Sequence, residues 1–300
     1  MSTHARVLTV EQVSQVKAAA RRRRAIARFF SYLLLSAVGL FLAFPLYWTA
    51  SSSLQTWQEL RSFTPHLLPS VPQWWNYPRV FQTQPFARWM LNTFLIVGIS
   101  IPGTLITSTM CAYSFARFNF AGRSVWFVIM LGTMMIPMWV TLIPQYLLFR
   151  ALRVINTYVP LTIGYWLGGG AFVIFMLRQF ILSIPRDLDE AAHIDGAGPL
   201  RILVQVIVPL MKPALTTVAI LTFLGQWNDF FGPFIYINKL ELFTVAVGLR
   251  YFQVIPMEGG EPKDHLLMAA SAITTIPVLI IFVAAQKYFV QGVVLSGLKL

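Results

Sequence analysis

The stretch that decides the fold is FFSYLLLSAVGLFLAFPLYWTA, residues 29–50, which contains no charged side chain. A helix of about 20 apolar residues spans the hydrocarbon core of a bilayer and satisfies its own backbone hydrogen bonds, which lipid cannot do. Arginines 21–24 precede this run, as basic residues precede the core of a signal peptide. The run is too long for such a core and lacks a small-residue cleavage site, so we interpret it as a retained first membrane helix.

The composition of the whole chain is also that of a membrane protein. Of 300 residues, 57% are hydrophobic and only 11% are charged, whereas soluble domains have about 25% charged residues. Six apolar stretches are long enough to cross a bilayer, at residues 29–50, 89–113, 125–149, 158–181, 214–237 and 266–289. We therefore predict an all-α integral membrane protein with six transmembrane helices.

The charge predicts an orientation. The chain has 23 Lys and Arg against 11 Asp and Glu, a net charge of +12. In a soluble protein such an excess would suggest a nucleic acid partner; here we expect basic cytoplasmic loops in contact with membrane lipid, and no nucleic acid. Basic residues are most frequent on the side of the N-terminus, which predicts both termini in the cytoplasm. We divide the chain into a basic arm (1–28), a membrane domain (29–290) and a cytoplasmic tail (291–300).

Helix-breaking residues lie inside several spans. Pro137 and Pro144 share one face of the third span, and Pro277 lies midway in the sixth. Proline is common in membrane helices, or these kinks let the bundle open alternately to each side. Gly168-Gly169-Gly170 in the fourth span predicts either close helix packing or a flexible point. Outside the spans, we expect an ordered, proline-rich loop at residues 51–88 and a second, irregular segment at roughly residues 238–265.

The loop at residues 183–213, SIPRDLDEAAHIDGAGPLRILVQVIVPLMKP, is predicted to form two short helices. Asp187 can cap the first helix, with Glu190 completing a capping box. Gly196 can end that helix with a positive φ, and Pro199 can begin the second. We expect Pro209 and Pro213 to end the second helix, whose apolar stripe is Leu200, Leu203, Val204 and Ile207.

Periodicity alone leaves two interpretations of this loop open. It is an interfacial pair of helices that lies on the lipid headgroups, or it is a docking element that fits a cleft in a partner protein. In the second interpretation Glu190 and Asp195 make the polar contacts.

A resemblance favours docking. Glu190-Ala191-Ala192, then Gly196, then Pro209 resemble the EAA signature of ABC importer permeases. The resemblance implies the transmembrane domain of a type I importer, with the loop as a coupling helix that docks into a groove of a separate ATPase subunit. It identifies Glu190, Ala191, Ala192, Asp195 and Gly196 as the ATPase-coupling residues.

Other segments resemble the carbohydrate permeases of the maltose-transporter type, specifically the second, six-helix permease of that pair. This resemblance implies sugar or oligosaccharide import by alternating access. It also implies a second permease, two ATP-binding subunits and an extracellular or periplasmic sugar-binding protein, in a bacterial or archaeal cell membrane. The segments are Asn76-Tyr77, Leu91-Asn92-Thr93, residues 116–123, 143–146 and 184–188, and the end of the chain from Gln286 to Lys299.

The chain itself is not expected to be an enzyme. It has no G-x-x-x-x-G-K-[ST] motif, and no Gly-Lys pair at all, so ATP hydrolysis is expected on a partner subunit. Its four histidines are scattered in the sequence, and we expect no bound metal and no cofactor.

One carboxylate lies inside a predicted span. Asp229 would cost about 2.5–3.5 kcal/mol at the bilayer centre if it faced lipid. It therefore faces a polar cavity or a partner group, or it lies nearer the outer surface, tied to a neighbouring backbone. Asn228 and Asp229 beside Trp227 suit a sugar, which needs hydrogen bonds and an aromatic surface. We take Trp227, Asn228 and Asp229 as candidates for the substrate path.

Other functions fit the sequence less well. A secondary transporter would carry coupling-ion carboxylates within its helices, usually across an internal repeat, whereas this sequence shows a single Asp in a span and no visible repeat. An ABC permease for another solute, such as glycerol phosphate, a peptide or an amino acid, stays open because few residues decide substrate preference.

Overall fold

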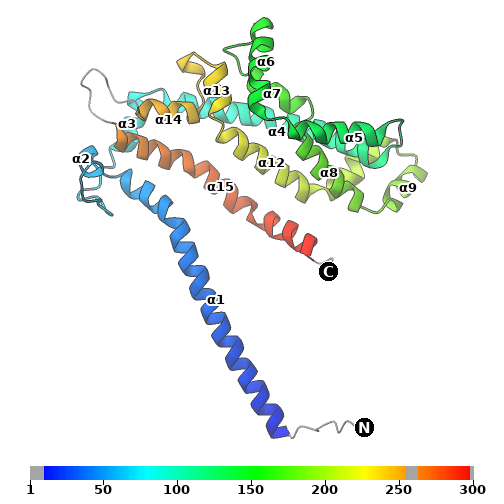
Figure 1. Cartoon of the computed structure of the whole chain (residues 1–300), viewed down its shortest axis with the longest axis horizontal. Coiled ribbons are helices and arrows are strands. Elements are labelled where there is room, and N and C mark those ends of the chain that lie inside the picture. The colour runs from blue at the N-terminus through cyan, green and yellow to red at the C-terminus, as the bar shows by residue number, and fades with distance from the viewer. Residues whose placement is uncertain (1–9, 254–262, 298–300) are drawn as a thin grey trace.

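The computed structural model describes residues 10–253 and 263–297, with side chains for residues 21–253 and 263–286. Of the segment that we expect to be irregular, residues 238–265, the part at 254–262 lies outside the described residues. The expectation is wrong for the described part, which contains a 3-10 turn at Leu240–Leu242 and a helix at Val245–Gln253. The regular elements of the described chain are helices (Figure 1). The first of these are α1 (Val10–Ser52), α2 (Trp57–Leu60), α3 (Asn76–Thr83), α4 (Phe86–Arg117), α5 (Arg123–Gly132), the 3-10 turn η1 (Thr133–Met135), α6 (Met138–Ala151), α7 (Val159–Trp166) and α8 (Ala171–Ser183).

The second half begins with the loop that the sequence predicts as two short helices. Its elements are α9 (Asp187–Ile194), α10 (Pro199–Ile202), the π-helical turn η2 (Leu203–Ile207) and α11 (Val208–Leu210). These are followed by α12 (Lys212–Trp227), α13 (Phe231–Tyr236), the 3-10 turn η3 (Leu240–Leu242), α14 (Val245–Gln253) and α15 (Asp264–Gly297).

Four segments are long and apolar enough to cross a membrane alone: Arg21–Ser52, Phe86–Arg117, Val159–Ser183 and Asp264–Gln286. Two bent helix pairs raise the number to six if each pair is one span. The described residues therefore contain four to six candidate spans in an all-helical chain, and the predicted number of six is the upper value. The predicted domain boundaries at residues 28 and 290 coincide with no helix end, because α1 and α15 run through them.

The third predicted span is not one continuous helix. The segments Arg123–Met135 and Met138–Ala151 meet at an angle of 97°. Pro137 causes the break, since proline disfavours the helical conformation of the residue before it. Ile136 is accordingly extended, with φ −80° and ψ 114°.

The fourth predicted span is interrupted between α7 and α8. Gly168, Gly169 and Gly170 all have positive φ, at 115°, 65° and 103°. Gly169 also lies against α4, where a Cβ would come within 2.5 Å of Ser108 Oγ and 2.8 Å of Thr104 Cγ2. The triple glycine thus permits a turn and close packing at the same place.

The fifth predicted span, residues 214–237, also requires correction. α12 ends at Trp227, and the separate helix α13 begins at Phe231. On its other side, the segment Pro199–Leu210 is bent by 81° from α12. Pro209 does not end the preceding helix as we expected: the π-helical turn η2 comes directly before it. A widened turn is one way for a helix to accommodate the missing N–H of proline and the clash of its ring.

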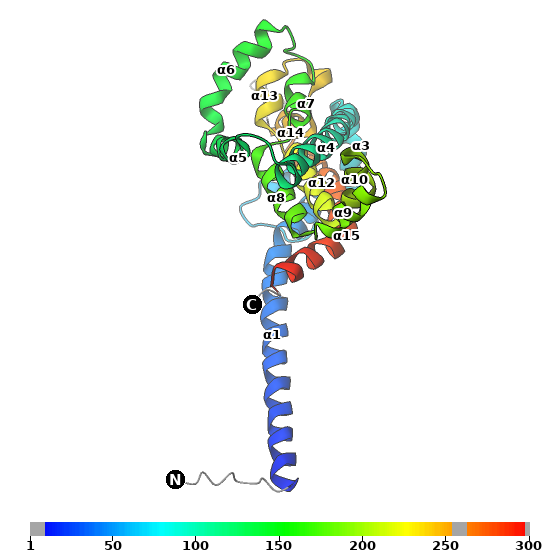
Figure 2. The same ribbon diagram turned by 90° about the vertical axis from the view of Figure 1, so that its right-hand side faces the viewer.

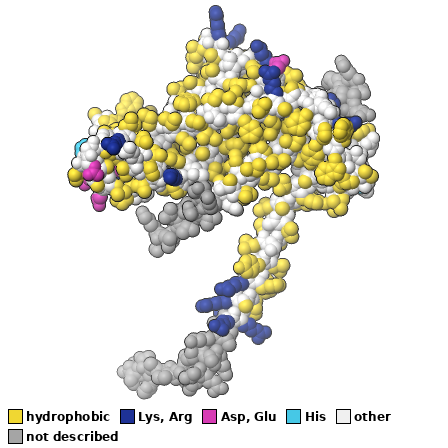
Figure 3. All heavy atoms as spheres, turned by 180° about the vertical axis from the view of Figure 1, so that it is seen from behind, with side chains coloured by type: hydrophobic (Ala, Val, Ile, Leu, Met, Phe, Trp, Pro, Cys, Tyr) yellow, Lys and Arg dark blue, Asp and Glu magenta, His cyan; other side chains and the backbone are white. Residues whose placement is uncertain are grey.

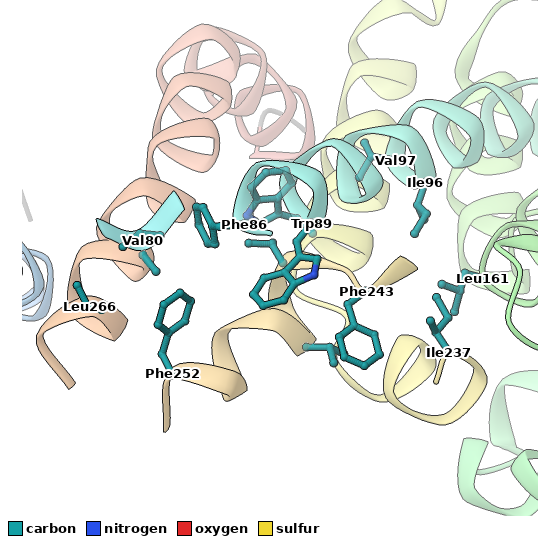
Figure 4. Packing of buried hydrophobic residues seen from close by; sticks show 14 of the residues in the cluster. Val80, Phe86, Trp89, Ile96, Val97, Leu161, Ile237, Phe243, Phe252 and Leu266 are labelled. Atoms are coloured by element: carbon teal, nitrogen blue, oxygen red, sulfur yellow. The ribbon is translucent and has the colours of Figure 1, made fainter. Parts of the chain in front are cut away.

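Helix α4 forms the centre of the molecule, with α7, α8 and α12 packed on it. Its buried face is rich in small and weakly polar residues, among them Ser100, Gly103, Thr104, Ser108 and Ala112. Small residues let membrane helices approach closely, and hydroxyl groups can hydrogen-bond back to the helix or across to a neighbour. Towards its N-terminal end α4 enters a large apolar cluster around Trp89 and Phe86, against Phe243 and Phe252 (Figure 4).

The segment that follows α1 is ordered by hydrogen bonds, as predicted for this proline-rich loop. Asn76 Nδ2 donates to the carbonyl oxygens of Ser53 and Gln55 at 2.9 and 3.0 Å. Thr56 and Glu59 form a capping box at the start of α2. The Thr56 backbone N–H that donates to the Glu59 carboxylate holds the pKa of this group well below its usual range, at about 2.

Helix α1 projects away from the other helices and contacts them only near its C-terminal end, against α15 (Figures 1 and 2). Its apolar side chains are exposed, with Leu40 at 75% and Phe41 at 77%. Arginine side chains flank the lower part of this helix, below its apolar stretch (Figure 3). A bare apolar helix of this length requires lipid or a partner protein around it.

Candidate functional site

The two-helix loop between α8 and α12 has the predicted glycine corner. Gly196 has φ +80°. Its N–H donates to His193 O at 3.0 Å, and the N–H of Ala197 donates to Ala192 O at 2.9 Å. These two bonds are the Schellman arrangement, which satisfies carbonyls at a helix end and favours glycine at the left-handed position. The C-terminal end of α9 and the start of α10 at Pro199 were therefore predictable from the sequence.

The predicted capping box at the start of α9 is wrong. Asp187 is the first residue of the helix, and the preceding Arg186, which is itself helical, makes no side-chain capping bond. The carbonyl of Arg186 accepts from the N–H groups of Asp189 and Glu190 at 2.9 and 3.0 Å. The helix begins earlier than the pattern indicated, and its third residue, Asp189, makes a contact outside the loop.

That contact is an ion pair with the end of α4. Arg117 Nε lies 2.6 Å from Asp189 Oδ2, and the two side chains are 5% and 17% exposed. Arg117 also donates to the carbonyl of Ile184 at 2.9 Å, and Arg186 donates to that of Ala116 at 3.5 Å. Charge pairs this well buried need close geometry and further hydrogen bonds to offset desolvation. The ion pair and these two hydrogen bonds therefore hold α9 and the residues just before it against the end of α4.

Sequence reasoning missed Arg117 and Asp189. The carbohydrate-permease resemblance includes Arg117 only as part of the segment 116–123, and no pattern singles out Asp189 from its neighbour Glu190. No local pattern joins them, because they are far apart in the chain and meet only after α4 and α8 have packed together.

The predicted coupling residues divide into two groups around α9. Glu190, Ala191, Asp195 and Gly196 are exposed, whereas Ala192 is half-buried against the second apolar cluster. Beside them Ile194 is 86% exposed. A pocket of about 410 Å³ lies between α9, the end of α4 and the start of α10, with Glu190, His193 and Ile194 on its rim. The loop thus exposes apolar and acidic side chains on a helix that an ion pair holds against α4.

The predicted apolar stripe of the second short helix is only half buried. Leu203 and Ile207 are buried, but Leu200 is 65% exposed and Val204 is 55% exposed. The π-helical turn over Leu203–Ile207 changes the helical period within the stripe. Leu200 therefore joins Ile194 as an exposed apolar residue of this loop.

The candidate path residues lie at the break between α12 and α13. Asp229 is half-buried and accepts a hydrogen bond from the Gly232 N–H at 3.1 Å, so it is tied to a neighbouring backbone, which was one of the alternatives. Asn228 is exposed and donates to Leu224 O at 2.9 Å. Trp227 is only 3% exposed.

The ring of Trp227 is not free to stack on a sugar in this conformation. It packs face to face on Phe223, with 5.2 Å between ring centroids, and contacts Phe94 at 4.9 Å. Its Nε1 donates to Thr274 O at 3.2 Å. Beside it, buried Gln226 donates to Ser100 Oγ and Leu161 O, each at 2.8 Å. Trp227 and Gln226 thus join α12 to α4, α7 and α15. Their contacts are structural, and they hold the end of α12 that carries Asn228 and Asp229.

Within the described residues, no group of three or more His, Cys, Asp or Glu side chains is arranged to hold a metal ion.

Comparisons with known proteins agree with this architecture. The family described as binding-protein-dependent transport system inner membrane component matches residues 104–295. The galactooligosaccharide permease GanQ of Bacillus subtilis is 34% identical over 92% of this chain and 97% of its own length. The arabinooligosaccharide permease AraQ of the same organism is 32% identical over 92% and 96%. A chain of a bacterial ABC transporter that imports the polysaccharide alginate superposes with a TM-score of 0.77 at 26% identity, over 89% of this chain and 98% of that one.

Proposed function

The chain belongs to the binding-protein-dependent transport system inner membrane components, and on that premise we propose how it works within an oligosaccharide importer. It is a permease subunit of an ABC importer and a multi-pass protein of the bacterial inner membrane, and ATP is hydrolysed on a separate subunit. The sugar class rests on the names and high coverage of the oligosaccharide permeases it resembles.

The observation that carries the proposed mechanism is the fastening of α9 to α4. Asp189 binds Arg117 on the inner side of α9, while Glu190, Ala191 and Asp195 stay exposed beyond it. An ATPase subunit that moves α9 would therefore move the end of α4 with it, since breaking the buried pair is costly. α4 runs through the centre of the molecule, so the motion would reach the path through the helices packed on α4.

We propose the partner set that the resemblance implies and assign its members to surfaces that this subunit leaves uncovered. We assign the exposed Ile194 and the acidic residues of α9 to an ATPase subunit, with two such subunits in the complex. We assign the bare apolar surface of α1 to a second permease and to lipid. A sugar-binding protein would dock on the opposite side of the membrane, near the hydrogen-bonded loop after α1, with both termini of the chain in the cytoplasm.

We place the substrate path at the break between α12 and α13. Asn228 and Asp229 supply polar groups where the helix is interrupted, and irregular backbone is tolerated at membrane depth only where it is buried or lines a cavity. Trp227 supports them from behind and would reach a sugar only after α12 has moved relative to Phe223.

The test is reconstitution of the transporter with its partners in liposomes, with ATP hydrolysis measured with and without sugar-loaded binding protein. Glu190→Lys should abolish the stimulation, because it reverses a charge on the exposed side of α9. Glu241→Lys is a matched control: it makes the same charge change at an exposed position outside the loop, and the ATPase subunits should stay bound. Stimulation unchanged by Glu190→Lys would contradict the coupling role.

A second arm tests the path. Asp229→Asn should alter the rate or the range of sugars transported while leaving ATPase docking intact. Identical transport by the variant and the unchanged protein would remove Asp229 from the path without affecting the assignment of α9.

A further inference from the structure

A basic site lies between the start of α5 and α8, away from α9. A pocket of about 130 Å³ is lined there by Phe115, Arg123, Ser124, Phe127, Val128 and Arg178. Neither arginine takes part in the contacts of α9 described above. The pocket therefore calls for an explanation of its own.

Both arginines are held in place by the protein. Arg178 Nε donates to Phe115 O at 3.2 Å, and its guanidinium carbon lies 4.2 Å from the centre of the Phe127 ring. Arg123 Nη1 donates to Phe118 O and to Asn119 Oδ1, both at 3.0 Å. These contacts order the two guanidinium groups and leave other N–H donors available, because each guanidinium carries five.

The two positive charges have no carboxylate partner among the described residues, where the ion pairs are Arg61–Asp264 and Arg117–Asp189. Arg123 is instead close enough to act electrostatically on Arg178. Two positive charges that share a pocket repel each other, whereas an anion bound between them would attract both. Arginine is also well suited to phosphate, which it can bind through two N–H donors at once.

The surroundings of the pocket are apolar. On α5 the side chains of Val125, Val128 and Ile129 are 61%, 66% and 53% exposed, next to the arginines. A soluble phosphate would make no use of this surface. An occupant with an anionic head and an apolar tail would use both parts, and such molecules surround any membrane helix.

We propose that this pocket binds the phosphate of an anionic phospholipid. Arg123 and Arg178 donate to the phosphate oxygens, and the Ser124 hydroxyl lies within the same pocket as a further donor. The acyl chains lie along Val125 and Val128. The lipid would join α5 to α8 at the level of the headgroups, and the site is independent of the coupling role of α9.

The experiment uses the assembled transporter in nanodiscs of equal parts phosphatidylglycerol and phosphatidylcholine, followed by native mass spectrometry of retained lipid. We expect retained phosphatidylglycerol on the unchanged protein. Arg123→Gln and Arg178→Gln should each lower that retention about tenfold, the factor that corresponds to about 1.4 kcal/mol. Arg178→Lys, which keeps the charge, should recover part of it.

Arg150→Gln is the matched control, because Arg150 is exposed in the last turn of α6 and lines none of these pockets. It should retain lipid at the level of the unchanged protein. If removal of Arg178 impairs folding, the lipid retention of Arg123→Gln alone tests the proposal. Arg123 is the first residue of α5, next to the preceding loop, where a substitution disturbs folding less.

Three results would overturn the proposal: equal retention of phosphatidylcholine, full displacement of the lipid by inorganic phosphate, or unchanged retention in both glutamine variants. Absence of retained lipid on the unchanged protein, as when a partner subunit covers the pocket, is a fourth such result. Because retention is measured without sugar or ATP, a failure here is distinguishable from a failure of the coupling role.

Discussion

Helices α1 and α4 are both long, apolar membrane helices, yet their environments differ completely. In the most apolar stretch of α4, 39% of residues are buried inside the chain, whereas in that of α1 none are. Hydropathy does not distinguish them. Small residues occur in both helices, but only in α4 do they meet a neighbour: Ser100, Gly103, Thr104 and Ser108 lie on its buried face, whereas a Cβ at Gly39 of α1 would meet nothing within 4 Å. Apolar length therefore predicts that a helix enters the membrane, and small residues permit close packing only where another helix is present.

The largest expected effect concerns the end of α4. Asp189→Ala leaves Arg117 buried without its charge partner, and removal of one partner from a buried pair costs about 3–5 kcal/mol. Because Asp189 is 17% exposed, we expect the lower end of that range. The measurement is the thermal stability of the purified transporter, together with sugar transport per ATP hydrolysed.

Asp187→Ala is the control, because Asp187 also lies in the first turn of α9 but is exposed. If both variants behave alike, the ion pair does not fasten α9 to α4.

A matched pair of glycines tests the comparison directly. A Cβ at Gly103 would lie 2.7 Å from the Trp166 ring, whereas a Cβ at Gly39 in α1 would meet nothing within 4 Å. Gly103→Ala should therefore destabilise the protein by about 1–3 kcal/mol through overpacking. Gly39→Ala should be neutral or slightly stabilising, since alanine is the better helix former. Equal melting temperatures for the two variants would refute the proposed difference.

The C-terminal end of α1 provides a smaller effect. Asn76→Ala removes both hydrogen bonds to the carbonyls of Ser53 and Gln55. Leaving buried acceptors unpaired costs about 1–3 kcal/mol, and adjustment of the loop should keep the loss near the lower value. Hydrogen exchange should rise over the residues after α1 and stay unchanged in α4. An increase spread over the whole chain would mean that α1 is joined to the bundle by more than its end.

The smallest effect is a pH dependence of the same loop. The Glu59 pKa is lowered from 4.5 to about 2, chiefly by the Thr56 N–H. A lowered pKa contributes stability that is complete above the unfolded value and is lost as pH falls from about 4.5 towards 2. Proteolysis of residues 57–70 at low pH should therefore increase over this range and do so less in Glu59→Gln. An identical acid response in both proteins would exclude Glu59 as the cause.

The sequence was most informative where one residue alone determines the backbone. Gly196 and Pro199 correctly predicted the corner between α9 and α10, and close packing, one of the two alternatives for the triple glycine at 168–170, is found at Gly169. Pro137 predicted a kink in the third span. The size of its angle, 97°, depends on how the segments before and after Pro137 pack against other helices. The Arg117–Asp189 pair and the buried position of Trp227 depend on contacts between distant segments. Such contacts leave no trace in hydropathy or local spacing.

The central claim is that α9 couples this permease to an ATPase subunit, and cysteine cross-linking tests it most directly. The chain has one cysteine, Cys111, so a Cys111→Ala background is free of thiols. In the reconstituted transporter, Ala191→Cys on the exposed side of α9 should cross-link to the ATPase subunit. Ser70→Cys, exposed in the loop after α1, should not. Cross-linking from Ser70→Cys but not from Ala191→Cys would contradict the account.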